Sequence, residues 1–343
     1  MNAKATTPPA APAAVPAGLP VSPLAPAATP KIGPVAGVRL TGAAAGLKKR
    51  AGAKDLMIAE LAPGTTIAGV FTNSLCASAP VDWCRAALKG GKARALVVNS
   101  GNSNAFTGKA GDLTVEHTVA EAAKRFKCRR SEVFIASTGV IGQPVPADHI
   151  ARHIGTVSRS LSKGGFADAA AAIMTTDTFP PLATRTANIG DTKVTLAGFA
   201  KGSGMIAPDM ATMLGFVFTD AKIPAAMLQR LLKRAVDKSF NSVTVDSDTS
   251  TSDTVLLCAT GQAKHGRVPA RGVPGALLKD FARALDEICI ELAQLIVRDG
   301  EGATKFVEIR VRGADSARAA HRIGMTIANS PLVKTAIAGE DAN

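Results

Sequence analysis

The feature that most constrains this chain is a glycine-rich polar run from Lys201 to Pro208, which leads through Ala211-Thr212 into the apolar run Met213 to Phe218. Glycine and proline favour a loop, and a short apolar run directly after a loop is typical of a buried strand. On this pattern alone, the segment is a loop that enters the interior of a sheet.

The Ala211-Thr212 junction also allows a chemical interpretation. A threonine hydroxyl is a poor nucleophile unless a base takes its proton. Cleavage before Thr212 would give that residue a free α-amine with a reference pKa of about 7.7–8.0, which is a base on the same residue. The small residues before the bond would permit the tight backbone conformation that self-cleavage needs. The residues alone leave both interpretations open.

Composition indicates a globular protein with a sizeable core. Hydrophobic residues make up 46% of the 343 residues and charged residues 20%, so one large domain or two can fold. The net charge of +13 brings nucleic acid into consideration, but the basic residues are dispersed, and aromatics reach only 4% with no Tyr. No apolar stretch is long enough to span a bilayer. We therefore expect neither a nucleic-acid nor a membrane partner.

The cysteines and histidines point away from a disulfide framework and a metal site. The five cysteines are odd in number and include no C-x-x-C pair, which is typical of reduced thiols in a cytoplasm. His149 and His153 have helical spacing, but no Glu stands beside His149 as an H-E-x-x-H zinc motif requires. Neither common glycine-rich phosphate loop is present. The expectation is a cytoplasmic protein with no metal and no cofactor.

The order of elements predicts an α/β architecture. Residues 1–34 are rich in Ala and Pro, which block helix and sheet, so we expect a disordered tail. That tail lacks the Arg of a transit peptide and the Leu-rich core of a secretory signal. Apolar patterns predict strands at 93–99, 132–137, 193–199, 213–219, 254–259 and 305–311. They predict helices at 113–128, at 146–161 with Pro146 in the first turn, from Pro224 onward and at 275–297. Such mixing favours helices that cover sheets.

Several separated segments resemble one known family. The run KGSGMIAPDMATML at 201–214 closely resembles the self-cleavage segment of the bifunctional ornithine acetyltransferases (glutamate N-acetyltransferase / N-acetylglutamate synthase) of arginine biosynthesis. Further matching segments follow the family's order: NSGN at 99–102, ASTGVIG at 136–142, MTTDTFP at 174–180, NSVTVDSDTSTSDT at 241–254 and DGEGATK at 299–305. The resemblance runs from about Ile32 to the last residue. It implies a layered α-β-β-α sandwich, with an α chain at 35–211 and a β chain at 212–343.

The resemblance also implies site roles, each beside an ordinary alternative. Thr212 would be the nucleophile after cleavage between Ala211 and Thr212. Thr138 and Gly139 would stabilise the oxyanion, although a Thr-Gly turn after a strand is common in inert proteins. Thr175, Lys201, Thr212 and Glu301 would bind substrate. Without the resemblance, Thr175 would belong to a capped helix end, Lys201 would be a surface lysine, and Glu301 would lie in a turn after a helix.

The implied activity is transfer of acetyl from N2-acetyl-L-ornithine to L-glutamate through acetyl-Thr212. Acetyl-CoA is a possible second acetyl donor, and the α and β chains would form a heterotetramer. The family pattern continues beyond Asn343, so we expect the β chain to be incomplete at its C-terminus and transfer to be impaired. Two other functions stay open: a self-processing aminopeptidase or amidase, which would give the acyl group to water, and an inactive remnant.

Overall fold

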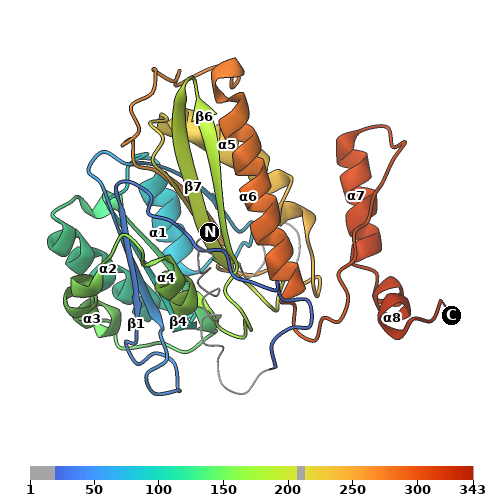
Figure 1. Ribbon diagram of the computed structural model, residues 1–343. Coiled ribbons are helices and arrows are strands. Elements are labelled where there is room, and N and C mark those ends of the chain that lie inside the picture. The colour runs from blue at the N-terminus through green and yellow to red at the C-terminus, as the bar shows by residue number, and fades with distance from the viewer. Residues whose placement is uncertain (1–19, 207–212, 343) are drawn as a thin grey trace, which may run out of the picture.

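The computed structural model describes residues 20–206 and 213–342, which form two sheets and their covering helices (Figure 1). The strands are β1 (Val38–Ala43), β2 (Leu56–Leu61), β3 (Thr66–Phe71), β4 (Ala95–Asn102), β5 (Val133–Val140), β6 (Leu182–Ile189), β7 (Thr192–Lys201), β8 (Leu214–Thr219) and β9 (Thr254–Ala259). The α-helices are α1 (Ala79–Leu88), α2 (Gly108–Phe126), α3 (His149–Val157), α4 (Phe166–Ile173), α5 (Ala225–Asp237), α6 (Lys279–Arg298), α7 (Ala317–Ala328) and α8 (Pro331–Gly339).

Each sheet combines antiparallel pairs with one parallel pair. The first sheet has the order β1-β2-β4-β5, and the second has the order β3-β9-β8-β7-β6. The parallel pairs are β4 with β5 and β8 with β9. A parallel connection needs a crossover, and here α2 lies in the chain between β4 and β5 and α5 lies between β8 and β9.

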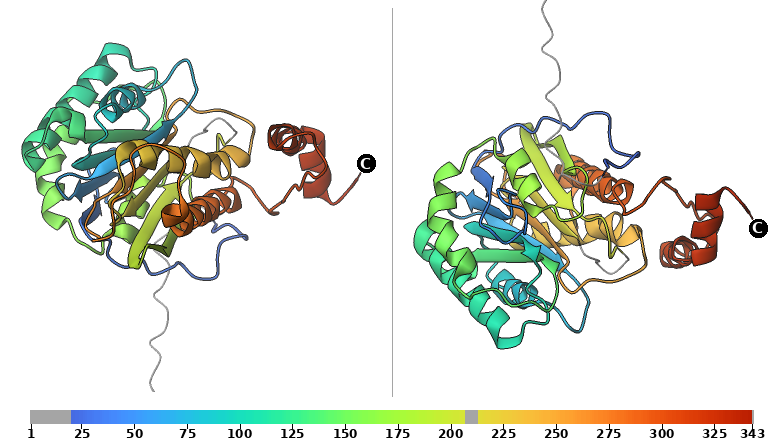
Figure 2. Two further views of the ribbon diagram at one scale, coloured as in Figure 1. Left: turned by 90° about the horizontal axis from the view of Figure 1, so that it is seen from above. Right: turned by 90° about the horizontal axis from the view of Figure 1, so that it is seen from below.

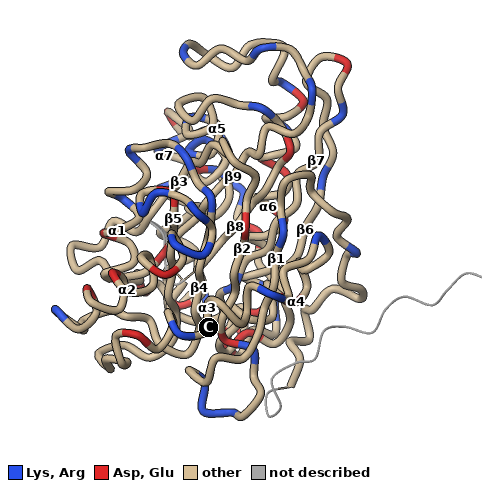
Figure 3. Tube along the Cα trace, turned by 90° about the vertical axis from the view of Figure 1, so that its left-hand side faces the viewer, with Lys and Arg blue, Asp and Glu red and all other residues tan. Residues whose placement is uncertain are grey.

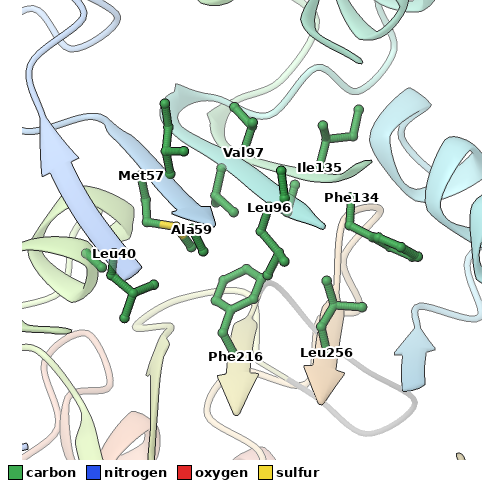
Figure 4. Close-up of a cluster of buried hydrophobic side chains, with 14 of the residues drawn as sticks. Leu40, Met57, Ala59, Leu96, Val97, Phe134, Ile135, Phe216 and Leu256 are labelled. Carbon is green, nitrogen blue, oxygen red and sulfur yellow. The ribbon is translucent and has the colours of Figure 1, made fainter. Parts of the chain in front are cut away.

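The two sheets pack face to face over a shared apolar core. Side chains alternate along a strand, so one face of each strand can meet the other sheet while its opposite face meets helices. Figure 4 shows Leu96 and Phe134 of the first sheet directed toward Phe216 and Leu256 of the second. Helices α2 and α3 lie outside the first sheet, and α5 and α6 cover the second (Figures 1 and 2). The predicted α-β-β-α sandwich is confirmed.

Helix α6 shows why the second sheet is covered so completely. Its apolar residues recur every three or four positions, and Phe281, Leu285 and Leu292 are fully buried. They belong to a second core cluster, which contains residues of β6 to β9 and of α5. The predicted helix at 275–297 is confirmed. It begins with a 3₁₀ turn at Ala276–Leu278, which leads directly into α6.

Two predicted elements need correction. The helix expected at 146–161 is shorter: the Pro146 carbonyl accepts the N–H of His149 in a turn before α3, and the last turn is 3₁₀. The strand expected at 305–311 is wrong. That segment has no regular secondary structure and pairs with no strand in the described part of the chain, and Val307 is 45% exposed. Alternation predicts an extended backbone, whereas a strand also needs a partner for its N–H and C=O groups.

The end of the expected disordered tail is held against the folded body. From residue 20 the chain is a coil with defined contacts: the N–H of Ser22 donates to Thr178 Oγ1 at 2.9 Å, and the Ser22 hydroxyl donates to the carbonyl of Arg298 at 2.6 Å. For residues 20–34, therefore, the expectation of disorder is wrong. Proline blocks regular structure, but it does not prevent a coil from binding a surface.

The described residues contain no helix that is long and apolar enough to cross a membrane. Within residues 20–206 and 213–342, no three His, Cys, Asp or Glu side chains are grouped as metal ligands would be. Lys and Arg occur on many separate elements (Figure 3), as their dispersal along the sequence predicts. All five cysteines are free.

Candidate active site

A cavity of about 570 Å³ opens where β5 and β7 end, and loops from both sheets line it. Four predicted site residues lie in its wall: Thr138, Gly139, Thr175 and Lys201. They come from different parts of the chain, so only the packing of the two sheets brings them together. The hydroxyl-rich run Ser250 to Ser252, just before β9, completes part of the wall.

The Thr138-Gly139 pair, expected in a turn after the strand, lies near the end of β5 and pairs with the parallel strand β4. Thr138 is 1% exposed, and its hydroxyl has no hydrogen-bond partner among the described residues. A buried hydroxyl without a partner costs free energy, so such groups call for an explanation. Gly139 has a φ of +129°, and a Cβ there would lie 2.5 Å from the carbonyl carbon of Gly101. Only glycine fits this contact, and the backbone of residue 139 also lines the cavity.

The polar segment Asn99 to Asn102 fixes this strand end from behind. Ser137 donates to Asn99 Oδ1 at 2.6 Å, and the Asn99 amide donates to the carbonyl of Asn102 at 2.8 Å. These side chains are buried at the end of the first sheet. Their hydrogen bonds hold β5 to β4 directly before Thr138 and Gly139.

Lys201 is the last residue of β7 and is 2% exposed, so the expectation of an ordinary surface lysine does not hold. Its ammonium donates to Thr175 Oγ1 at 3.2 Å and forms no ion pair with a described residue. Burial lowers the pKa of Lys201, while Asp177, Asp253 and Glu301 act in the opposite direction. A buried cation with a single neutral partner is a favourable site for a carboxylate.

Asp177 joins the two loops that carry Thr175 and Lys201. Its carboxylate accepts the N–H of Thr175 at 2.7 Å and the N–H of Gly202 at 2.6 Å. The sequence suggested a helix cap for this residue, and the long-range bond to Gly202 could not be seen there. Asp177 therefore sets the distance between Thr175 and Lys201.

Asp253 is the second buried carboxyl that sequence reasoning left without a role. Its Oδ1 accepts the N–H of Met213 at 2.9 Å, while its Oδ2 is buried with no hydrogen-bond partner in the described chain. Desolvation raises the pKa of Asp253 well above its usual range. The N–H of Thr254 donates in turn to the carbonyl of Met213. Residue 213 is thus fixed on both sides at the start of β8.

Glu301 lies just after α6, beside the cavity and outside its lining. Its N–H donates to the carbonyl of Ser203 at 3.0 Å. Its carboxylate lies so close to Gly204 that a Cβ there would be 2.9 Å from Glu301 Oε1. Because Gly204 lines the cavity, Glu301 contacts the site through this glycine.

The segment 241–254, one of those that resemble the family, contacts the residues on both sides of the predicted cleavage site. Asp246 accepts the N–H groups of Met205 and Ile206, the last residues described before the cleavage segment. The predicted cleavage residues Ala211 and Thr212 lie outside the described residues. On either side of them, Ile206 and Met213 are held by the carboxylates of Asp246 and Asp253.

The chain matches the ArgJ family over residues 39–343. It belongs to the ArgJ family. It is 56% identical over 324 residues to the Arginine biosynthesis bifunctional protein ArgJ of Bradyrhizobium diazoefficiens. The aligned region covers 94% of this chain and 78% of that protein. The ArgJ of Gluconobacter oxydans is 54% identical, with 95% of this chain and 76% of the relative covered.

A solved structure with a related sequence is the ornithine acetyltransferase of Mycobacterium tuberculosis complexed with ornithine. It is 36% identical to this chain and covers 51% of it, with 92% of its own chain aligned and a TM-score of 0.43. The ArgJ assignment rests on the sequence matches, which confirm the family that the motifs indicated.

Proposed function

We propose that this chain is an acetyltransferase of arginine biosynthesis that moves acetyl from N2-acetyl-L-ornithine to L-glutamate. The observation that carries the proposal is the buried Thr138 hydroxyl, which has no partner and lies in one cavity wall with Gly139, Thr175 and Lys201. Membership of the ArgJ family supports the reaction class and the pathway. The name of the Mycobacterium relative supports the donor.

The proposed nucleophile is Thr212, freed by cleavage of the Ala211–Thr212 bond. Its hydroxyl oxygen attacks the acetyl carbonyl of the donor, and its own α-amine accepts the hydroxyl proton. The resulting oxyanion would accept hydrogen bonds from the Thr138 hydroxyl and the Gly139 N–H. Donors that are already in place before the reaction stabilise such charge without reorganisation.

Collapse of this intermediate breaks the bond between the acetyl carbon and the ornithine nitrogen. The proton on the α-amine of Thr212 passes to that nitrogen, ornithine leaves, and acetyl remains on Thr212 as an ester. The amine of glutamate then attacks the ester carbonyl through the same oxyanion site. N-acetylglutamate is released and Thr212 regains its proton.

The remaining wall residues would bind and orient the substrates. Lys201 would pair with the α-carboxylate that donor and acceptor share, because it is a buried ammonium without an ion pair to a described residue. Thr175 would contact the substrate through its hydroxyl, in a position fixed by Asp177. Glu301, beside Gly204, would recognise an amino group.

Three finer expectations belong to the same proposal. Acetyl-CoA would acylate Thr212 as a second donor, which would give N-acetylglutamate synthase activity without ornithine. Residues 35–211 and 212–343 would remain together as α and β chains of a heterotetramer. A cytoplasmic location is proposed because the five cysteines are all free thiols.

Mass spectrometry and steady-state kinetics test the proposal together. The smaller fragment should begin at Thr212, gain one acetyl group on incubation with acetylornithine, and lose it to glutamate. Parallel double-reciprocal lines should accompany this two-step exchange. Net release of acetate without acetylglutamate would instead identify an amidase. An uncut, unacetylated chain that still transfers acetyl would rule out the Thr212 route.

Thr138→Val tests the oxyanion role directly. Loss of one such donor typically costs about 2.7–4 kcal/mol, so turnover should fall by about 10²–10³-fold with little change in substrate affinity. Thr118→Val is the matched control, because the Thr118 hydroxyl is buried in α2 and bonds only the Thr114 carbonyl. An equal loss of turnover in both variants would show that the effect comes from a change in packing and not from a lost oxyanion donor.

A further inference from the structure

The wall of the active-site cavity is cationic. Three lysines line it, Lys48, Lys49 and Lys201, and its described lining contains no Asp or Glu. A cavity with one sign of charge in its wall concentrates ligands of the opposite sign. Of these three lysines, Lys201 is the one proposed to bind the α-carboxylate that both substrates share.

The loop that carries Lys48 is rigidly held. The buried Asp55 accepts three backbone N–H groups from this loop, those of Ala45 at 2.5 Å, Leu47 at 2.6 Å and Lys48 at 3.0 Å. A side chain on such an anchored backbone has a defined place in the wall. Lys49 is exposed on the same loop, and its N–H is not among the groups that Asp55 accepts.

The Lys48 ammonium is half-buried, with spare hydrogen-bonding capacity. It donates to the Lys54 carbonyl at 2.7 Å and forms no ion pair with any described residue. The two carboxylates whose charges act on Lys48, Asp55 and Asp177, already accept backbone N–H groups. Desolvation lowers the pKa of Lys48, the charges of Asp55 and Asp177 act against this, and the charge of Lys201 acts in the same direction as desolvation. An anion bound in the wall that the two lysines share would therefore stabilise both ammonium groups.

We infer that Lys48 binds the side-chain carboxylate of the acceptor and thereby selects a dicarboxylic amino acid. Two ammonium groups in one wall match the two carboxylates of glutamate, with Lys201 on the α-carboxylate and Lys48 on the distal one. This inference rests on the proposed function, since it assigns the specificity of the second half of that reaction. The donor has a single carboxylate, so Lys48 acts on the choice of acceptor.

The test compares glutamate with glutamine as acetyl acceptors, because the two differ only in the distal group. The measured quantity is the ratio of their kcat/KM values in one enzyme preparation, which does not depend on the active fraction. We expect the wild type to prefer glutamate, and Lys48→Gln to lower the ratio at least tenfold. Lys163→Gln, which removes the same charge from an exposed lysine outside the cavity wall, should leave the ratio unchanged.

Two further measurements separate the possible failures. Calorimetry measures the binding of glutamate and of glutamine to each variant, and it tests the role of Lys48 even if the wild type transfers no acetyl. Absence of acetyl transfer in the wild type would overturn the proposed function but not the inference about Lys48. An unchanged preference for glutamate in Lys48→Gln, in both transfer and binding, would overturn the inference alone. A raised KM for acetyl-CoA with an unchanged acceptor ratio would assign Lys48 to a phosphate and would also overturn it.

Discussion

Helices α6 and α7 have similar amphipathic patterns and opposite environments. In α6 the apolar side chains are fully buried against β6, β7 and α5. In α7 no residue is buried, and Ile323 and Ile327 are 45% and 37% exposed. Figures 1 and 2 show α7 and α8 standing away from the two-sheet body. An apolar stripe thus predicts a helix, but the helix becomes part of a core only if a sheet lies opposite.

The C-terminal arm, residues 303–342, contributes no described residue to either core cluster and reaches the body in part through polar contacts. Lys334 donates to the Val245 carbonyl at 2.8 Å, and His321 is hydrogen-bonded to the Asn241 carbonyl. Both acceptors belong to the segment that leads to Asp246 and Asp253. The body is therefore held by burial, whereas the arm is held by hydrogen bonds that water can replace. Substitutions should be costly in the first region and tolerated in the second.

The largest effect on catalysis is expected at Gly139, where a close backbone contact and the proposed oxyanion site coincide. Gly139→Ala places a Cβ 2.5 Å from the backbone of Gly101 and displaces the proposed oxyanion donors. Loss of an oxyanion donor together with a displaced site should lower kcat by about a thousandfold or more. The control is Gly142→Ala, where φ is also positive, at +76°, but no atom lies within 4 Å of the new methyl. Similar kinetics for both variants would show that backbone strain, not the collision, is responsible.

A large effect on stability is expected in α6. Leu292→Ala removes a fully buried side chain and leaves a cavity between α6 and the second sheet, which should lower the free energy of unfolding by about 2–5 kcal/mol. Urea unfolding, followed by circular dichroism, measures the change. A loss below about 1 kcal/mol would mean that α6 is no more firmly packed than α7, and the contrast between the regions would disappear.

Asp299, at the boundary of the two regions, should make stability depend on pH. It caps α6, accepts the N–H of Thr178 at 2.7 Å, and has a pKa raised to about 6, chiefly by desolvation. Because this folded-state pKa lies above the unfolded value of about 3.9, folding favours the protonated form. Its contribution is complete below about pH 4 and is lost as the pH rises through 6.

Asp299→Asn removes this titration. Relative to the variant, the wild type should gain about 2 kcal/mol in unfolding free energy between pH 7 and pH 4. Denaturant melts at several pH values measure the difference between the two proteins. If the unfolding free energies of the two proteins change with pH in parallel, Asp299 does not ionise between pH 4 and pH 7 in the folded protein.

The smallest effect is expected in the arm. Ile323→Ala removes methyl groups from a side chain that is already 45% exposed, so the unfolding free energy should change by less than about 0.5 kcal/mol. A loss as large as that of Leu292→Ala would show that α7 is buried against a partner in solution. The same urea experiment on both variants makes the comparison direct.

Local signals account for the correct predictions. The apolar run before Thr138-Gly139 predicts the position of β5, although the strand continues through that pair to Val140. The three-to-four spacing of Phe281, Leu285, Ile288 and Leu292 predicts α6. Those patterns depend on residues that are neighbours in the chain, and the sequence contains them completely.

The parts that could not be predicted depend on distant contacts. The bond from Asp177 to Gly202 spans 25 residues and that from Asp253 to Met213 spans 40, and nothing in the local sequence marks these acids among others. Lys48 is one of many basic residues in the sequence, and only the fold brings it into the same cavity wall as Lys201. The segment 305–311 has the alternation of a strand, but the partner that a strand requires is a property of the whole fold.

The pairing of β7 with β8 has a consequence for the topology of the chain. The last residue of β7, Lys201, pairs with the first of β8, Leu214, and five further residue pairs follow along the two strands. A cut at Ala211–Thr212 would fall between adjacent strands in the middle of a five-stranded sheet. The two products would stay together as parts of one folding unit, because the pairing of β7 with β8 would join them within the same sheet. Neither half has a complete core, so the halves should melt in a single transition, and each would serve as the template on which the other folds.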